Sequence, residues 1–250
     1  MVHAKPLLNS VSKTNRRHSL IQKGDGVVVG LSGGPDSTAL ALILSLFARK
    51  YRLRLYAAHL NHGLQEEAAS HEILSKKLAQ SLGFPFHSKK LNIRRLAKER
   101  RRSIEETGRD ERYRFFAEVA RRTRAKKIAT AHTLDDQAET VLLRILRGTG
   151  LRGLAGIPVK RRHGRRLMVI RPFLETPKKT ILDFLQKNKI PFAKDPTNRN
   201  LGFARNRVRH WLIPQIERRF GRNIRRTLVR LAESAASGSP APGTGRPSAA

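Results

Sequence analysis

Residues 32 to 37 combine backbone and side-chain groups that suit phosphate binding. They read Ser-Gly-Gly-Pro-Asp-Ser and follow an apolar, β-branched run from Val27 to Leu31. Gly33 and Gly34 allow a positive φ and a close approach of the backbone to a ligand, and Pro35 suits the first position of a helix. Because free N–H groups and the positive end of the helix dipole attract anions at a helix start, we expect a phosphate site where strand, loop and helix meet.

This loop differs from the two commonest nucleotide-binding patterns. No Gly-Lys-Ser/Thr follows its glycines, and it lacks the G-x-G-x-x-G of dinucleotide-binding folds. Ser-Gly-Gly-x-Asp-Ser after a strand resembles the loop of the ATP-pyrophosphatase superfamily, whose members hold the pyrophosphate of ATP and transfer AMP to an acceptor oxygen. The alternative is a tight turn in which Ser32 caps the helix and Asp36 only adds charge to its first turn. The strand before the loop and the helix after it favour nucleotide binding.

A second polar stretch runs from His132 to Thr140. Its Asp136 and Glu139 stand three residues apart on a predicted helix, so their side chains leave neighbouring parts of one flank. Paired carboxylates near a triphosphate suit Mg²⁺, which prefers oxygen ligands. Acidic residues in a first turn also stabilise any helix, and Thr133 with Asp136 approximates a capping box. The glycine-rich loop elsewhere in the chain favours the functional interpretation.

Four further side chains could contact a nucleotide or a substrate: Arg109, Arg112, His59 and His62. The two arginines stand three apart on a predicted helix, where they could neutralise phosphates or stack on a base. The alternative is a solvated basic face, because Lys and Arg make up 52 of the 250 residues. The histidines end a predicted strand, where they could position substrate or cap the strand. A metal site built on them lacks its other ligands.

The elements that would position these residues alternate between strand and helix. Apolar runs predict strands at 27–31, 53–60, 85–91, 127–132 and 167–170, and helical spacing predicts helices at 35–49, 68–82, 104–122, 134–147, 176–187, 203–220 and 224–236. This order predicts an α/β fold with a doubly wound parallel sheet, Rossmann-like and similar to the ATP-pyrophosphatase type, and a small helical C-terminal extension. Ligands of such sheets lie beyond the carboxyl ends of the strands. The rule groups Ser32–Ser37, His59–His62 and His132–Asp136 around one crevice.

Four regions are expected along the chain. Residues 1–24 form a basic, partly helical lead-in whose apolar side chains pack on the domain that follows, and residues 25–160 form the nucleotide-binding α/β domain. Residues 161–233 supply the C-terminal part of the catalytic domain and a helical linker, with a turn at 195–198 and a bend at Pro214. Residues 234–250 contain only Ser, Ala, Gly, Pro, Thr and Arg, which predicts a disordered tail.

Composition limits the classes of function. With 52 Lys and Arg against 19 Asp and Glu, the formal charge is +33, which favours a polyanionic partner: RNA, DNA or an anionic membrane surface. The alternative is a proteome whose proteins are generally cationic. The absence of cysteine excludes disulfides, thiolate-bound zinc, iron–sulfur centres and thiol nucleophiles. No apolar run approaches the roughly 20 residues of a membrane span, and we expect a cytoplasmic protein.

Six segments, taken in order, resemble the family of tRNA(Ile)-lysidine synthetases: Ser32–Ser37, His59–Gly63, Glu105–Phe116, His132–Gly153, Ile170–Pro172 and Asp195–Pro214. The similarity covers about residues 24 to 220, and its most specific run is Leu-Asp-Asp-Gln-Ala-Glu-Thr-x-Leu-Leu-Arg-x-x-Arg-Gly, from position 134. The resemblance implies a ligase that forms a carbon–nitrogen bond. Such enzymes adenylate the wobble cytidine of an isoleucine tRNA with ATP and Mg²⁺, and the amine of lysine then displaces AMP to give lysidine.

The resemblance also implies a role for each matching residue. The residues assigned to ATP are Ser32, Gly33, Gly34, Asp36, Ser37 and His59, with Asp36 acting through Mg²⁺. Arg109 and Arg112 would hold the activated cytidine or the phosphates, and Asn206 would bind substrate from the second subdomain. Asp136 and Glu139 would act with the metal and the incoming lysine, and Arg205 would complete the site. The expected catalytic residues are therefore Asp36, Arg112, Asp136, Glu139 and Arg205.

The implied partners are a tRNA(Ile) with the anticodon CAU and free L-lysine, with no membrane partner. The sequence is compatible with a dimer and does not determine the oligomeric state. Many family members carry further C-terminal domains that grip tRNA, and we expect the basic surface to replace part of that grip here. Two alternatives are another ATP-dependent tRNA-modifying adenylase, such as a thiolase, and a catalytically retired RNA-binding protein. The absence of cysteine counts against the first, and the presence of Asp36, Asp136 and Glu139 counts against the second.

Overall fold

The computed structural model describes residues 3–63, 68–193, 201–221 and 223–238. They belong to two compact units that interleave along the chain. The first unit comprises Met1–Thr133 and Val159–Asp195, and the second comprises Leu134–Pro158 and Pro196–Ala250. The division expected at residue 160 is linear, whereas these units are each built from two separate segments.

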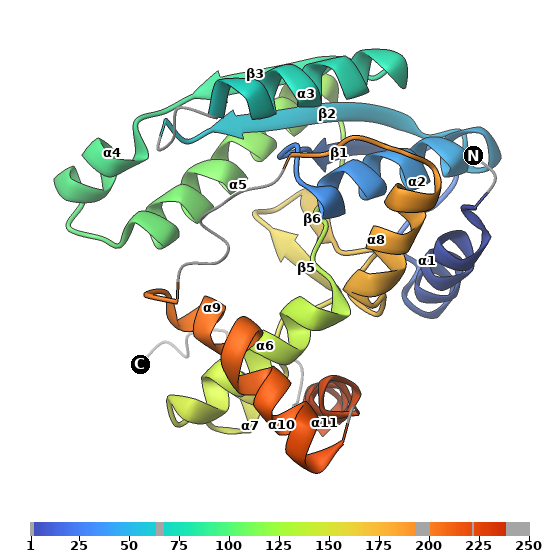
Figure 1. Ribbon diagram of the computed structural model, residues 1–250. Coiled ribbons are helices and arrows are strands. Elements are labelled where there is room, and N and C mark those ends of the chain that lie inside the picture. Colours follow the sequence, from blue (N-terminus) through green and yellow to red (C-terminus); the bar gives the residue numbers. More distant parts are fainter. Residues whose placement is uncertain (1–2, 64–67, 194–200, 222, 239–250) are drawn as a thin grey trace, which may run out of the picture. The chain divides into compact units, whose positions relative to one another are not determined.

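The first unit contains a six-stranded sheet, shown in Figure 1. Its strands are β1 (Gly26–Gly30), β2 (Arg54–Asn61), β3 (Phe86–Lys90), β4 (Lys127–Ala129), β5 (Lys160–His163) and β6 (Leu167–Ile170), in the order β3-β2-β1-β4-β6-β5. All neighbouring pairs are parallel except β5 with β6. The order runs outward from β1 in both directions, so the predicted doubly wound sheet is confirmed, with its switch point between β1 and β4.

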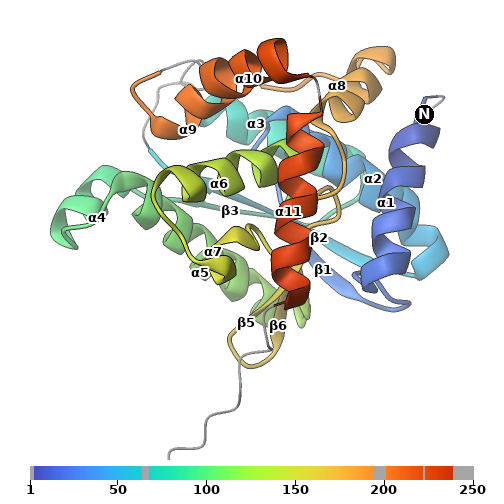
Figure 2. The same cartoon turned by 90° about the horizontal axis from the view of Figure 1, so that it is seen from below.

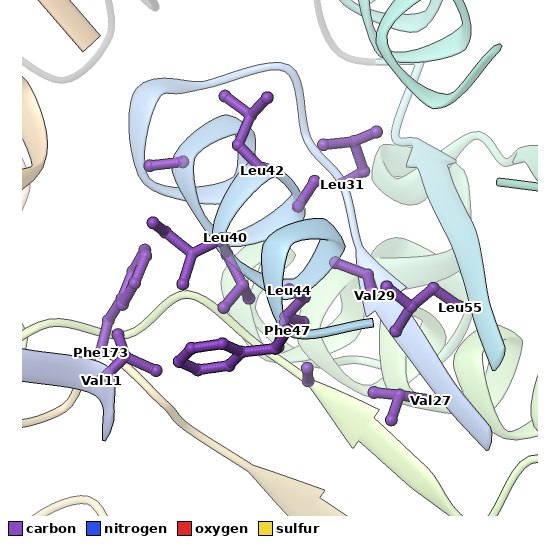
Figure 3. Packing of buried hydrophobic residues seen from close by; sticks show 14 of the residues in the cluster. Val11, Val27, Val29, Leu31, Leu40, Leu42, Leu44, Phe47, Leu55 and Phe173 are labelled. Atoms are coloured by element: carbon purple, nitrogen blue, oxygen red, sulfur yellow. The ribbon is translucent and has the colours of Figure 1, made fainter. Parts of the chain in front are cut away.

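Successive residues of β1 point to opposite faces of this sheet and enter different cores. Val27 and Val29 share a core with apolar residues of α2 (Pro35–Tyr51), of α8 (Lys178–Lys187) and of the segment that precedes β1. Figure 3 shows this core around Leu40, Leu44 and Phe47 of α2. Val28 packs on the other face against the aromatic residues of α5 (Ile104–Thr123). Both faces are therefore covered, as the continuous apolar run of β1 requires.

The basic lead-in contains a helix, α1 (Lys5–His18). Leu7, Val11, Leu20 and Ile21 are buried in the same core as α2, which confirms that this region packs on the domain. The described part of the first unit also contains α3 (Ala68–Ser81) and α4 (Ile93–Glu99).

Two short elements of the first unit were not predicted. Helix α4 buries only Ile93 and Ala97, too few apolar positions to give a helical period. Strand β5 reads Lys-Arg-Arg-His and lies antiparallel at the edge of the sheet. Charged residues suit an exposed edge strand, where they discourage pairing with other chains, but they give no strand signal in a sequence.

The second unit is helical among its described residues. Its helices are α6 (Leu134–Leu146), α7 (Leu151–Leu154), α9 (Ala204–Arg207), α10 (Ile213–Phe220) and α11 (Ile224–Gly238). Figure 2 shows α11 beside α6, and their apolar faces share a core that includes Val141 and Leu228. The predicted helical C-terminal extension is thus confirmed.

A π-helical turn, Val208–Leu212, joins α9 to α10 at the place where a bend was expected. Pro214 has no N–H for the usual bond to the fourth residue before it, and a wider turn accommodates its ring. The expected disordered tail was wrong for residues 234–238, which continue α11. Residues 239–250 and the expected turn at 195–198 lie outside the described residues. No helix of the described chain is long and apolar enough to cross a bilayer.

Candidate active site

The glycine-rich loop lies between β1 and α2, at the carboxyl edge of the sheet. The Ser37 hydroxyl donates to the Gly34 carbonyl (3.1 Å) and accepts from the Ser32 amide (3.1 Å) and the Ser32 hydroxyl (3.0 Å). In the described part of the chain, the amides of Gly33, Gly34 and Ser37 donate no hydrogen bond. The loop is therefore closed by its own serines, and its amides remain for an anion at the start of α2.

Gly33 and Gly34 differ in what the protein demands of them. Gly33 has a φ of +81°, and a Cβ there would lie 3.0 Å from the His71 carbonyl oxygen. Gly34 has a φ of −72°, and the nearest atom to its Cβ would be the Ser32 hydroxyl at an ordinary 3.6 Å. Folding thus explains the glycine at 33, while the surrounding protein leaves room for a side chain at 34.

Asp36 occupies the first turn of α2 and forms an ion pair with Lys178, whose Nζ lies 2.9 Å from Asp36 Oδ2. Lys178 begins α8, some 140 residues further along the chain. The pair holds a cation beside the loop, where it could also contact a phosphate. Spacing along the sequence could not reveal Lys178, because it reaches the loop only through the fold.

The same loop offers one carboxylate to a Mg²⁺ ion. Asp36 supplies one carboxylate, and no group of three or more metal-binding side chains occurs among the described residues. Mg²⁺ commonly takes one or two protein carboxylates and completes its shell with phosphate oxygens and water. Asp36 therefore fits a Mg²⁺ that is held jointly with a nucleotide, and the ion would compete with Lys178 for its carboxylate.

His59 supports the loop from behind. Its ring is 4% exposed, and its Nδ1 donates to the Leu31 carbonyl at 2.8 Å. Burial lowers the pKa of His59, which favours the neutral ring. His59 thus fixes the residue that enters the loop, and its contact with ATP stays a prediction.

Arg112 on α5 contacts His62, which lies just after the end of β2. Its Nη2 lies 3.2 Å from His62 Nε2, which accepts because a guanidinium can only donate. Burial and the charge of Arg112 lower the pKa of His62 to about 4, so the ring is neutral at pH 7. Part of the Arg112 side chain is exposed to solvent. Desolvation by the protein around its guanidinium lowers the pKa of Arg112. Arg109 is exposed one turn earlier on the helix.

A group of cations surrounds Tyr113 beside these arginines. The Arg161 guanidinium lies 5.7 Å from the ring centroid, and Arg171 Nη2 donates to the Tyr113 hydroxyl at 3.4 Å. Arg171 is 1% exposed, and burial lowers its pKa. Sequence reasoning gave neither arginine a role. Arg161 stands among many basic residues, and Arg171 entered only as part of the segment Ile170–Pro172.

In the second unit, two arginines hold the paired carboxylates of α6. Arg205 contacts Glu139 and Asp136, each at 2.9 Å. Arg209, on the π-helical turn, contacts the same two carboxylates at 2.6 and 3.1 Å. The structure therefore brings together the predicted residues Asp136, Glu139 and Arg205, and it adds Arg209, which was not predicted. Asn206 lies between these two arginines in the sequence, and its side chain is buried.

The other polar residues of the α6 motif have structural partners. Asp135 pairs with Arg225 of α11 at 3.1 Å. Gln137 accepts from the Ile157 amide at 2.6 Å, and the positive φ of Gly156 brings the backbone within reach of that side chain. The specific sequence of this motif thus serves to fold the second unit as well as to present Asp136 and Glu139.

Comparison with known proteins gives a consistent assignment. The family model described as the PP-loop domain matches residues 6–216. The tRNA(Ile)-lysidine synthase of Clostridioides difficile is 37% identical over 229 residues, which are 91% of this chain and 49% of that protein. The enzyme of the same name from Clostridium perfringens is 41% identical over 221 residues, 88% of this chain and 46% of that protein. This chain spans about half the length of the curated relatives it matches.

A solved structure shares the fold. The U34-tRNA thiolase from Methanococcus maripaludis, which holds a 4Fe-4S cluster, superposes with a TM-score of 0.76 over 95% of this chain and 80% of that one. Its sequence identity is 18%, so the likeness concerns the fold alone. Together with the loop geometry and the family match over most of the chain, these findings lead to one assignment: the chain belongs to the PP-loop domain family.

Proposed function

We propose that this chain uses ATP and Mg²⁺ to convert the wobble cytidine of a tRNA(Ile) with the anticodon CAU into lysidine. The observation that carries the proposal is the loop, whose amides remain available beside Asp36 and whose Gly34 leaves room for a ligand. Relatives at 37% and 41% identity that are named tRNA(Ile)-lysidine synthase support this choice of acceptor.

In the first proposed step, the carbonyl oxygen of cytosine attacks the α-phosphorus of ATP and pyrophosphate leaves. The amides of Gly33, Gly34 and Ser37 stabilise the departing phosphates, and Lys178 contributes a positive charge beside them. A Mg²⁺ held by Asp36 would supply further positive charge to them. Arg109 and Arg112 bind the activated cytidine or the phosphates.

In the second proposed step, the lysine amine attacks the activated ring carbon and AMP leaves. Lysine is charged at neutral pH, so its ammonium must first lose a proton, and Asp136 is the proposed acceptor. Arg205 and Arg209 already hold Asp136 and Glu139. An incoming ammonium would therefore replace part of the contacts that the two arginines make with these carboxylates. Asn206 is proposed to help position the substrate.

The test is incorporation of radiolabelled lysine into tRNA(Ile) bearing CAU, with ATP and Mg²⁺ and with an active lysidine synthetase in parallel. We expect label in the tRNA that depends on ATP, and none in a tRNA whose wobble base is U. No label with this chain, while the parallel enzyme is active, contradicts the proposal. Incorporation of sulfur from a sulfide donor instead would favour the thiolase alternative.

The proposed substrates also set the expected location and partners. A tRNA, ATP and free lysine meet in the cytoplasm, where we propose that the protein acts. Each step needs one active centre, and nothing in the proposed chemistry requires a second copy of the chain.

A further inference from the structure

The segment from Lys89 to Arg102 is strongly basic. It contains eight Lys and Arg residues and a single acid, Glu99. The exposed side chains include Arg94, Lys98 and Arg101. Helix α4 forms the middle of this segment, and its large apolar side chains are buried or half-buried.

Ion pairs divide the six cations between Ile93 and Arg102 into two groups. Arg95 pairs with Glu99 at 2.7 Å, Arg100 with Glu111 at 2.6 Å and Arg102 with Asp110 at 2.5 Å. The last two pairs fasten the end of the segment to α5. Arg94, Lys98 and Arg101 form no ion pair with any residue of the described chain. We call these three residues the α4 cations.

The α4 cations are carried by a fixed helix next to the candidate site. Asn92 caps the helix by accepting from the Arg95 amide at 3.0 Å. The Ile93 amide donates to the His62 carbonyl at 3.2 Å, and the His62 ring in turn accepts from Arg112. Figure 1 shows α4 beside the first turns of α5, the helix that carries Arg109 and Arg112.

We propose that the α4 cations form an RNA-binding surface that holds backbone phosphates of the tRNA beside Arg112. The inference rests on the proposed function, which supplies an RNA whose modified base must approach this site. Between residues 89 and 102, the described chain exposes no large apolar side chain that could stack on bases or enter a lipid bilayer. Recognition here is therefore ionic, independent of base sequence and sensitive to salt.

A second basic run at the opposite end of α5 provides a matched control. Arg101 and Arg124 both have a left-handed φ, 50° and 56°, which glycine adopts without strain. Arg121 and Lys126 are exposed and form no ion pair with other described residues, like Arg94 and Lys98. The 20 residues of α5 separate the two runs by about 30 Å.

The experiment compares the α4 variant, Arg94→Gln, Lys98→Gln and Arg101→Gly, with the control variant, Arg121→Gln, Lys126→Gln and Arg124→Gly. Each loses three charges in the same way. Dissociation constants for tRNA are measured from 50 to 300 mM KCl, with urea unfolding to verify both folds. We expect the α4 variant to bind at least tenfold more weakly at the lowest salt, with a salt slope smaller by about 2, and the control variant to bind within about twofold of the wild type.

Equal losses in both variants, or no loss in the α4 variant, would overturn the surface. So would unchanged tRNA affinity combined with lost binding to vesicles that contain phosphatidylserine, because that result assigns the cations to lipid. Lysine incorporation by the wild type is measured alongside. If the wild type incorporates lysine and the α4 variant binds tRNA as tightly as the wild type, the RNA-binding surface is refuted and the proposed reaction stands. Weakened binding by the α4 variant without any wild-type activity supports the surface and removes only the proposed reaction.

Discussion

At the scale of single residues, the two neighbouring glycines of the loop show how folding and ligand binding make separate demands. The positive φ of Gly33 and the close His71 carbonyl leave no room for a side chain. Gly34 has ordinary backbone angles and free space at its α-carbon. A glycine that the protein itself does not need indicates that something outside the protein must come close.

We predict that Gly34→Ala and Gly33→Ala will have opposite effects. Gly34→Ala should leave the free energy of unfolding within about 0.5 kcal/mol of the wild type but weaken ATP binding at least tenfold. Gly33→Ala should cost about 1–2 kcal/mol or more of stability, because alanine is strained at a left-handed φ. Urea unfolding and calorimetric titration with ATP measure both effects. Wild-type ATP affinity in Gly34→Ala would argue against a nucleotide at this loop.

His62 gives the protein a pH dependence that can be checked. Its pKa in the folded chain is about 4, below the ordinary 6.5. Between these two pH values the unfolded chain therefore binds a proton at His62 that the folded chain does not. Stability contributed by the neutral ring is present above pH 6.5 and is lost as the pH falls towards 4, by up to about 3 kcal/mol. His62→Gln keeps an acceptor for Arg112 without titrating. Unfolding free energies at pH 7 and 4.5 should therefore differ less in this variant, and an equal difference would refute the assignment.

At the scale of elements, α6 and the α9–α10 segment are joined by a group of four charges. Glu139 is 2% exposed and contacts both Arg205 and Arg209. Removing one partner from such a buried group leaves a charge without full compensation. The carboxylates proposed for catalysis therefore also hold the second unit together, and a loss of activity on mutation needs a stability measurement beside it.

A double-mutant cycle separates these two contributions. We expect Glu139→Gln and Arg209→Met each to lower the unfolding free energy by about 2–4 kcal/mol. The double variant should lose less than the sum, with a coupling energy of at least about 1 kcal/mol. Urea unfolding measures all four proteins at one pH. Additive losses would show that the contact between Arg209 and Glu139 contributes little.

The elements that could be predicted are those whose burial leaves a period in the sequence. β1 has a β-branched run buried on both faces, and α6 repeats its apolar residues at helical spacing. β5 and α4 left no such trace, because one is an exposed basic edge and the other buries two residues. The loop and both carboxylates were predicted from local motifs. Lys178 and Arg209 were not, since their partners lie far away in the chain and basic residues are too common to stand out.

At the scale of the whole molecule, the formal charge of +33 dominates long-range interactions. A positive surface accelerates and strengthens association with RNA through release of counterions from its phosphates. We predict that tRNA affinity will fall by a factor of about 10³ or more between 50 and 200 mM KCl if six or more phosphates are contacted. Filter binding across this range measures it, and an affinity that is insensitive to salt would exclude a mainly ionic interface.

The interleaving of the two units has a consequence for synthesis on the ribosome. The chain leaves the first unit at Thr133, returns at Val159 and leaves again at Asp195. Asp136 and Glu139 are therefore translated well before the arginines that neutralise them. At about 5–20 residues per second, Arg205 follows Glu139 by roughly 3–13 s. During that interval the nascent α6 carries two carboxylates that must stay solvated, so the core of the second unit closes only once α9 and α11 have emerged.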